Sequence, residues 1–125
     1  VCSSDLMKES MNYNIIFKNI DIDIHHLKNI INSCNLYKII NLSTAINKNI
    51  MKIIKHYRTN LFNNPDLKCI GPIYLTILRM KIEHLQGILN NKNYYFSNNK
   101  MNELLENGID KCNQYLEIID SYINV

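Results

Sequence analysis

One stretch of the chain constrains the fold more than any other, because its apolar residues recur in alternating steps of three and four. The positions are Leu36, Ile39, Ser43, Ile46, Ile50, Ile53 and Tyr57. This spacing is the pattern of a helix that buries one narrow face, and Ile40 and Ile54 are expected to widen that face. The sequence therefore predicts a long helix over residues 36–59, with Asn35 as its N-cap.

A shorter apolar stripe precedes this helix and predicts another over residues 23–34. Asp23 is the expected N-cap, and Ile22 and Leu27 then occupy the two positions of a hydrophobic staple. Residues 7–22 form an N-terminal lead segment whose sequence fits either a leading helix or an extended arm.

Two helices are expected in the second half of the chain. The third starts either at Pro65 or after the Gly71-Pro72 break, which gives 65–91 or 72–91. The fourth covers residues 98–124 and has Ser97 as its expected N-cap. The sequence thus predicts an all-α fold, a compact antiparallel bundle of about four helices, in a single domain over residues 23–125.

The composition bears on the origin of the chain. Of the 125 residues, 22 are Ile, 21 are Asn and 12 are Lys. All three have AT-rich codons, so we interpret the source as a very AT-rich genome, such as that of a virus, phage, symbiont or parasite. Residues 1–6, VCSSDL, depart from this composition and equal the translation of GTG TGC TCT TCC GAT CT, the end of a common sequencing adapter. We interpret them as translated adapter and expect the native chain to start at Met7 or Met11.

Cysteine usage and hydropathy limit the compartment. The cysteines beyond residue 6 are Cys34, Cys69 and Cys112, an odd number with no C-x-x-C spacing. We expect buried, reduced thiols in the cytoplasm, or in the host-cell cytoplasm if the source is viral. No run approaches the roughly 18 consecutive apolar residues of a membrane span, so no membrane partner is expected. The net charge of +3 does not by itself imply nucleic acid.

Arg79 and His84 belong to the hexapeptide R-M-K-I-E-H, an arginine followed by four residues and then a histidine. This spacing resembles the ribonuclease motif of HEPN-type helical bundles, although Met80 stands where a polar residue is usual. The resemblance implies that the pair would activate an RNA 2′-hydroxyl and stabilise charge on the phosphate. The alternative is structural: Arg79 pairs with Glu83 at i,i+4 on a solvated face, and His84 flanks the core.

A basic stripe follows one face of the predicted long helix. It consists of Lys48, Lys52, Lys55 and Arg58. These residues are candidates for tracking a nucleic-acid backbone, and the alternative is the solvated face of an amphipathic helix. The predicted last helix is acidic, so the two helices can also complement each other within the bundle or across a dimer. Its acidic residues are Glu103, Glu106, Asp110, Glu117 and Asp120.

Tyr94 and Tyr95 lie beside Lys and Asn residues in the connection before the last helix. Exposed aromatic rings in such a setting can stack on single-stranded bases. The alternative, which we favour, is that the rings fold back and close one end of the bundle.

The chain carries no motif typical of an enzyme. It has no Gly-rich phosphate loop, no G-x-S-x-G and no H-E-x-x-H, and its His and Cys residues lack the spacing of zinc ligands. We therefore expect no metal and no cofactor. The sequence favours a small non-enzymatic binding or adaptor protein that acts through protein–protein contacts, with a protein partner or as a homodimer. An RNA-acting HEPN-like bundle and a nucleic-acid-binding protein remain the alternatives.

Overall fold

Four α-helices make up most of what the computed structural model describes, which is residues 12–62, 70–91 and 98–124. They are α2 (Tyr13–Ile30), α3 (Leu36–His56), α4 (Gly71–Leu89) and α5 (Asn99–Ile123). A 3-10 turn (Ile31–Ser33) follows α2, and a π-helical turn (Tyr57–Leu61) continues α3. Within these ranges there is no strand, and the predicted all-α bundle is confirmed.

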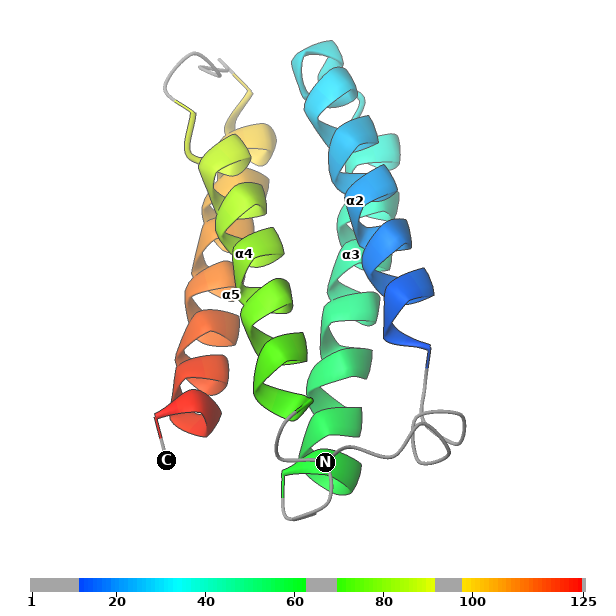
Figure 1. The fold of residues 1–125 in the computed structure, drawn as a ribbon. Coiled ribbons are helices and arrows are strands. Elements are labelled where there is room, and N and C mark those ends of the chain that lie inside the picture. The colour runs from blue at the N-terminus through cyan, green and yellow to red at the C-terminus, as the bar shows by residue number, and fades with distance from the viewer. Residues whose placement is uncertain (1–11, 63–69, 92–97, 125) are drawn as a thin grey trace.

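Successive helices run in opposite directions and form two hairpins, α2–α3 and α4–α5 (Figure 1). The hairpins pack so that α2 lies beside α4 and α3 lies beside α5, and these neighbours run in the same direction. The packing is uneven. Within each hairpin the helices are in close contact along their length, whereas α3 and α5 approach each other at few points.

The first helix starts ten residues earlier than the sequence analysis placed it. Asn12 is the N-cap, and its side chain accepts a hydrogen bond from the backbone N–H of Ile15 at 3.3 Å. The predicted N-cap at Asp23 is wrong, because Asp23 lies in the body of α2. Ile16, Phe17 and Ile20 are buried and carry the apolar stripe upstream, so residues 13–22 are helical rather than an extended arm.

The predicted hydrophobic staple of Ile22 and Leu27 is also wrong, because Asp23 is not the N-cap of the helix. Ile22 is on the outer face of α2 and is 43% exposed, whereas Leu27 is in the core. The helix ends earlier than residue 34, because Cys34 adopts a left-handed conformation with φ of 56°. That backbone conformation cannot continue a right-handed helix.

The long helix matches its prediction closely. Asn35 is the N-cap and accepts a hydrogen bond from the backbone N–H of Lys38 at 3.2 Å. The seam is in the core, and Ile54 widens it as expected. Ile40 does not, since it is 47% exposed and faces the α5 side of the helix.

The bounds of the last two helices also follow the prediction. Helix α4 begins at the Gly71-Pro72 pair, and a start at residue 65 lies outside the described residues. Helix α5 is capped by Asn98, whose side chain accepts from the backbone N–H of Lys100 at 2.9 Å. The predicted cap at Ser97 is therefore wrong by one position.

The core lies between the two hairpins and is apolar. Its fully buried members include Ile20, Ile24, Ile46, Ile50, Leu75, Leu78, Ile82 and Ile119. The α2–α4 contact also has a polar tie, because Nζ of Lys81 donates to both carboxylate oxygens of Asp21 at 2.8 Å and lies over the ring of Phe17. Among the described helices, none combines the length and apolarity needed to cross a membrane.

Candidate functional site

A groove runs along the side of the bundle where α3 and α5 are poorly packed. It consists of two hollows of about 470 and 650 Å³ that share Thr44, Asn47 and Lys111. The remaining residues of its walls include Ile39, Ile40, Met51, Leu89, Leu104, Leu105, Gly108 and Gln114. The first hollow therefore mixes apolar residues of both helices with polar ones, among them Ser43, Asn107 and Asp110.

A hydrogen bond between the two helices crosses the middle of the groove. The hydroxyl of Tyr115 donates to Oδ1 of Asn47 at 3.0 Å. Burial raises the pKa of Tyr115, so the phenol stays neutral and keeps its proton for this bond. This pair holds α3 and α5 at a fixed distance where their apolar side chains do not.

Lysines surround the other end of the groove. Lys48, Lys52 and Lys55 project from α3, and Lys111 projects from α5. Among the described residues none of these four forms an ion pair. Since no described ion pair neutralises their charges, this end of the groove favours an anionic group.

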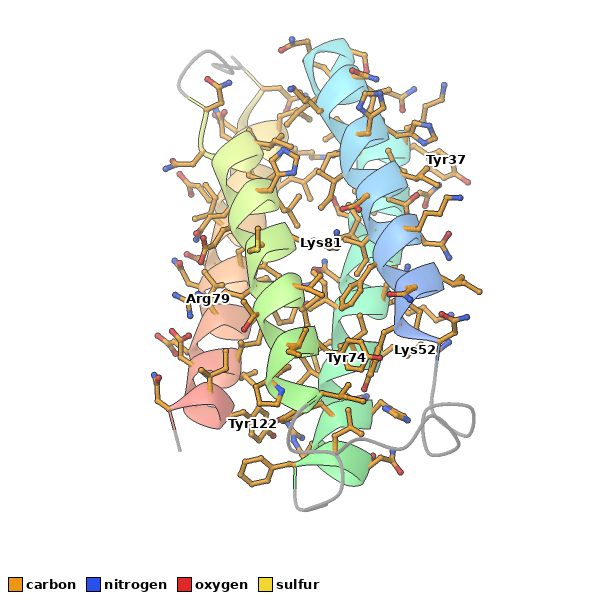
Figure 2. All side chains as sticks on the ribbon, in the orientation of Figure 1. Tyr37, Lys52, Tyr74, Arg79, Lys81 and Tyr122 are labelled. Atoms are coloured by element: carbon orange, nitrogen blue, oxygen red, sulfur yellow. The ribbon has the colours of Figure 1, made fainter. Side chains whose placement is uncertain are left out.

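The residues of the predicted basic stripe do not all lie at the groove. Its three lysines line the groove, but Nε of Arg58 donates to the hydroxyl of Tyr122 at 2.5 Å. Tyr122 lies near the C-terminal end of α5 (Figure 2), so Arg58 ties the ends of α3 and α5 together. Sequence reasoning missed Lys111, because nothing local in the sequence indicates that α5 lies beside α3.

The acidic residues of α5 do not neutralise these lysines. Asp110 lines the groove, whereas Glu103, Glu106 and Glu117 are exposed, and within the described chain none of the four forms an ion pair with α3. The described ion pairs therefore do not support the expectation that the basic and acidic helices complement each other within the bundle.

Arg79 and His84 lie on α4, away from the groove. Arg79 is half-buried and bonds to Glu83 at 2.9 Å and to Asp120 of α5, which confirms the predicted i,i+4 pair. His84 is exposed. A five-residue step places the two side chains about 140° apart around a regular helix. The catalytic role stays a prediction, and it would require Arg79 to exchange two carboxylates for a phosphate.

The remaining candidates are placed as follows. Tyr94, Tyr95 and Cys69 lie outside the described residues. Cys112 is buried as expected, and burial raises the pKa of its thiol to about 11, which suppresses the reactive thiolate. Cys34 is exposed, contrary to the prediction, since it lies in the turn between α2 and α3. The described part of the chain brings together no group of His, Cys, Asp and Glu suited to a metal ion.

An aromatic cluster that the sequence analysis did not anticipate closes the N-terminal end of α2. The hydroxyl of Tyr13 lies 2.6 Å from Nδ1 of His56, and the Tyr13 ring packs on Tyr74 with centroids 4.2 Å apart. Burial raises the pKa of Tyr13 and lowers that of His56. The pair is therefore a neutral phenol hydrogen-bonded to a neutral imidazole.

We expect His56 to make the stability depend on pH. The unfolded chain takes up a proton at this histidine near its ordinary pKa of 6.5, whereas the folded chain does so only at lower pH. Stability is therefore lost as the pH falls through 6.5 towards the folded-state pKa. Melting temperatures at about pH 7.5 and about pH 5.5 measure this loss.

His56→Gln should reduce that difference in melting temperature, whereas His84→Gln, which changes an exposed histidine, should leave it unchanged. An equal acid shift in the wild type and in His56→Gln would contradict the assignment.

The sequence matches no protein-family model, no curated protein and no solved structure. The class of the protein is therefore defined by its architecture: the described residues form an all-α bundle of four helices. The candidate site of this bundle is the lysine-rimmed groove between the parallel helices α3 and α5.

Proposed function

We propose that this protein is a non-enzymatic binding or adaptor protein whose α3–α5 groove takes an acidic amphipathic helix of a partner protein. The observation that carries the proposal is the combination of apolar side chains in the groove, among them the 47%-exposed Ile40, with three lysines of α3 that form no ion pair with a described residue. A helix with one apolar face and acidic flanks can contact the apolar side chains of the groove and pair with its lysines at the same time.

The same groove suits a nucleic acid less well. Its one aromatic side chain, Tyr115, is buried and engaged with Asn47, so none of the described groove residues offers a free ring for stacking. The acidic residues on the outer face of α5 would also repel a phosphate backbone laid along that helix. A helical peptide bound in the groove does not have to lie along this acidic face.

The proposal is tested with a designed 18-residue amphipathic helix that carries Glu on its polar face, labelled for fluorescence anisotropy. We expect the acidic peptide to bind, and a peptide with the same apolar face but Lys in place of Glu to bind at least about tenfold more weakly. Affinity for the acidic peptide should fall as salt is added.

Two pairs of variants locate the binding site. Reversing Lys48, Lys52 and Lys55 to Glu should weaken binding at least about tenfold, whereas reversing Lys18 and Lys28, exposed lysines of α2 that do not line the groove, should not. Ile40→Glu should weaken binding, and Ile22→Glu, at a similarly exposed isoleucine of α2, should not.

Equal binding of both peptides would contradict the proposal. Tight binding of a single-stranded RNA oligonucleotide, lost in the same groove variants, would replace it with the nucleic-acid alternative.

A further inference from the structure

The second hollow of the groove, of about 650 Å³, combines the size of a small-molecule site with a high positive charge. Four of the residues that line it are lysines, namely Lys48, Lys52, Lys55 and Lys111. Among the described residues that line it there is no aspartate or glutamate, since Asp110 lines the first hollow instead. Sites for small ligands commonly enclose roughly 300–1,000 Å³. The hollow therefore suits a small anion.

The four lysines come from both helices that form the hollow. Lys48, Lys52 and Lys55 follow one another over seven residues of α3, which is about 10 Å along the helix axis, and Lys111 lies on α5. Lys48 and Lys52 are four residues apart, a spacing at which like charges destabilise a helix. A ligand that reaches all four ammonium groups must carry several negative charges along a short chain, and it would relieve this repulsion.

Neutral hydrogen-bond donors lie in the same hollow. The hydroxyl of Tyr115 donates to Oδ1 of Asn47, so the acceptor atom of this amide is occupied and Nδ2 is left as a donor. The hydroxyl of Thr44 also lines the hollow. Within the described chain neither Nδ2 of Asn47 nor Oγ1 of Thr44 is engaged in a hydrogen bond. Phosphate oxygens accept hydrogen bonds from such donors and from ammonium groups alike.

We propose that this hollow binds a short polyphosphate chain through its four lysines. Such a chain occurs both in inorganic polyphosphate and in nucleoside triphosphates. Tyr115, the aromatic residue among those that line the hollow, is buried and bonded to Asn47, so a nucleobase gains no ring to stack on. We therefore expect the phosphate chain alone to carry the affinity.

Binding of a polyphosphate has a consequence for the groove as a whole. The anion would occupy the lysines with which the acidic helix of a partner protein pairs, so it would compete with that helix. This competition rests on the proposed function, whereas binding of the polyphosphate itself does not.

Isothermal titration calorimetry with inorganic tripolyphosphate, at low salt and without divalent metal, tests the inference. Because exposed lysines contribute little each, we expect a dissociation constant of roughly 10 to 1,000 µM that rises as salt is added. Orthophosphate at the same ionic strength should bind at least about tenfold more weakly. ATP should bind as tightly as tripolyphosphate, and tighter binding of ATP would identify a nucleotide as the source of the phosphate chain.

Single variants locate the site. Lys52→Gln and Lys111→Gln, one on each helix, should each weaken tripolyphosphate binding about threefold. Lys18→Gln and Lys28→Gln, which remove the same charge from exposed lysines of α2, should leave it unchanged. Equal effects of the two pairs, or equal affinities for tripolyphosphate and orthophosphate, would overturn the proposal.

The same titrations separate this inference from the proposed function. Tripolyphosphate should displace the labelled acidic peptide from the wild-type protein. If the peptide binds and tripolyphosphate does not, the polyphosphate site is wrong and the peptide groove stands. If tripolyphosphate binds and the peptide does not, the polyphosphate site stands and the proposed function is wrong.

Discussion

Replacing Ile20 with alanine should lower the free energy of unfolding by about 2–5 kcal/mol, the cost of removing a large buried aliphatic side chain. Ile20 is fully buried in α2, between the hairpins. The residue lies in the segment for which the sequence fits a helix and an extended arm equally well. The substitution therefore measures whether residues 13–22 belong to the core.

Ile22→Ala is the matched control, because it removes the same atoms two positions along the same helix from a side chain that is 43% exposed. Its effect should stay within about 0.5 kcal/mol. Urea unfolding followed by circular dichroism gives both values. Similar losses for the two variants would mean that this stretch of α2 does not present one face to the core.

The second large effect is expected at Gly71, the first residue of α4. A Cβ at this position would lie 2.6 Å from Cε2 of Tyr57, closer than any van der Waals contact allows. The Tyr57 ring is buried and is flanked by Phe62 and Tyr122, so it cannot swing aside freely. We expect Gly71→Ala to destabilise the protein by about 1–3 kcal/mol.

Gly87→Ala provides the comparison within the same helix. Its Cβ would meet open space, and alanine is favoured over glycine in a helix, so this substitution should stabilise the protein by about 0.5–1 kcal/mol. The sign of the change in thermal midpoint distinguishes the two sites. Adding Tyr57→Leu to Gly71→Ala should recover part of the loss, and strict additivity would contradict the clash.

The parts of the fold that the sequence predicts correctly are those decided within a few residues. The seam of α3 repeats over its own length, and Asn35 caps it through a bond to Lys38, three positions away. Local signals can also give a wrong helix boundary where two of them compete. Asp23 resembles an N-cap, but the apolar stripe through Ile20 continues the helix past it, and burial of that stripe outweighs one cap.

The candidate site is less predictable, because its parts are far apart in the chain. Lys48, Lys52 and Lys55 could be recognised as one exposed face of a helix. That Lys111 completes the rim, and that Tyr115 bonds to Asn47 at a separation of 68 residues, depends on how the hairpins dock. The Tyr13–His56 pair, 43 residues apart, likewise has no local signal.

The uneven contact between the hairpins has a mechanical consequence. Between the hairpins, α2 and α4 are in more extensive contact than α3 and α5, which are joined by the hydrogen bonds Asn47–Tyr115 and Arg58–Tyr122. A small rotation of one hairpin relative to the other about the α2–α4 contact would change the distance between α3 and α5 without separating the helices inside either hairpin. The width of the groove therefore depends on the angle between the two hairpins, and these two hydrogen bonds oppose its widening.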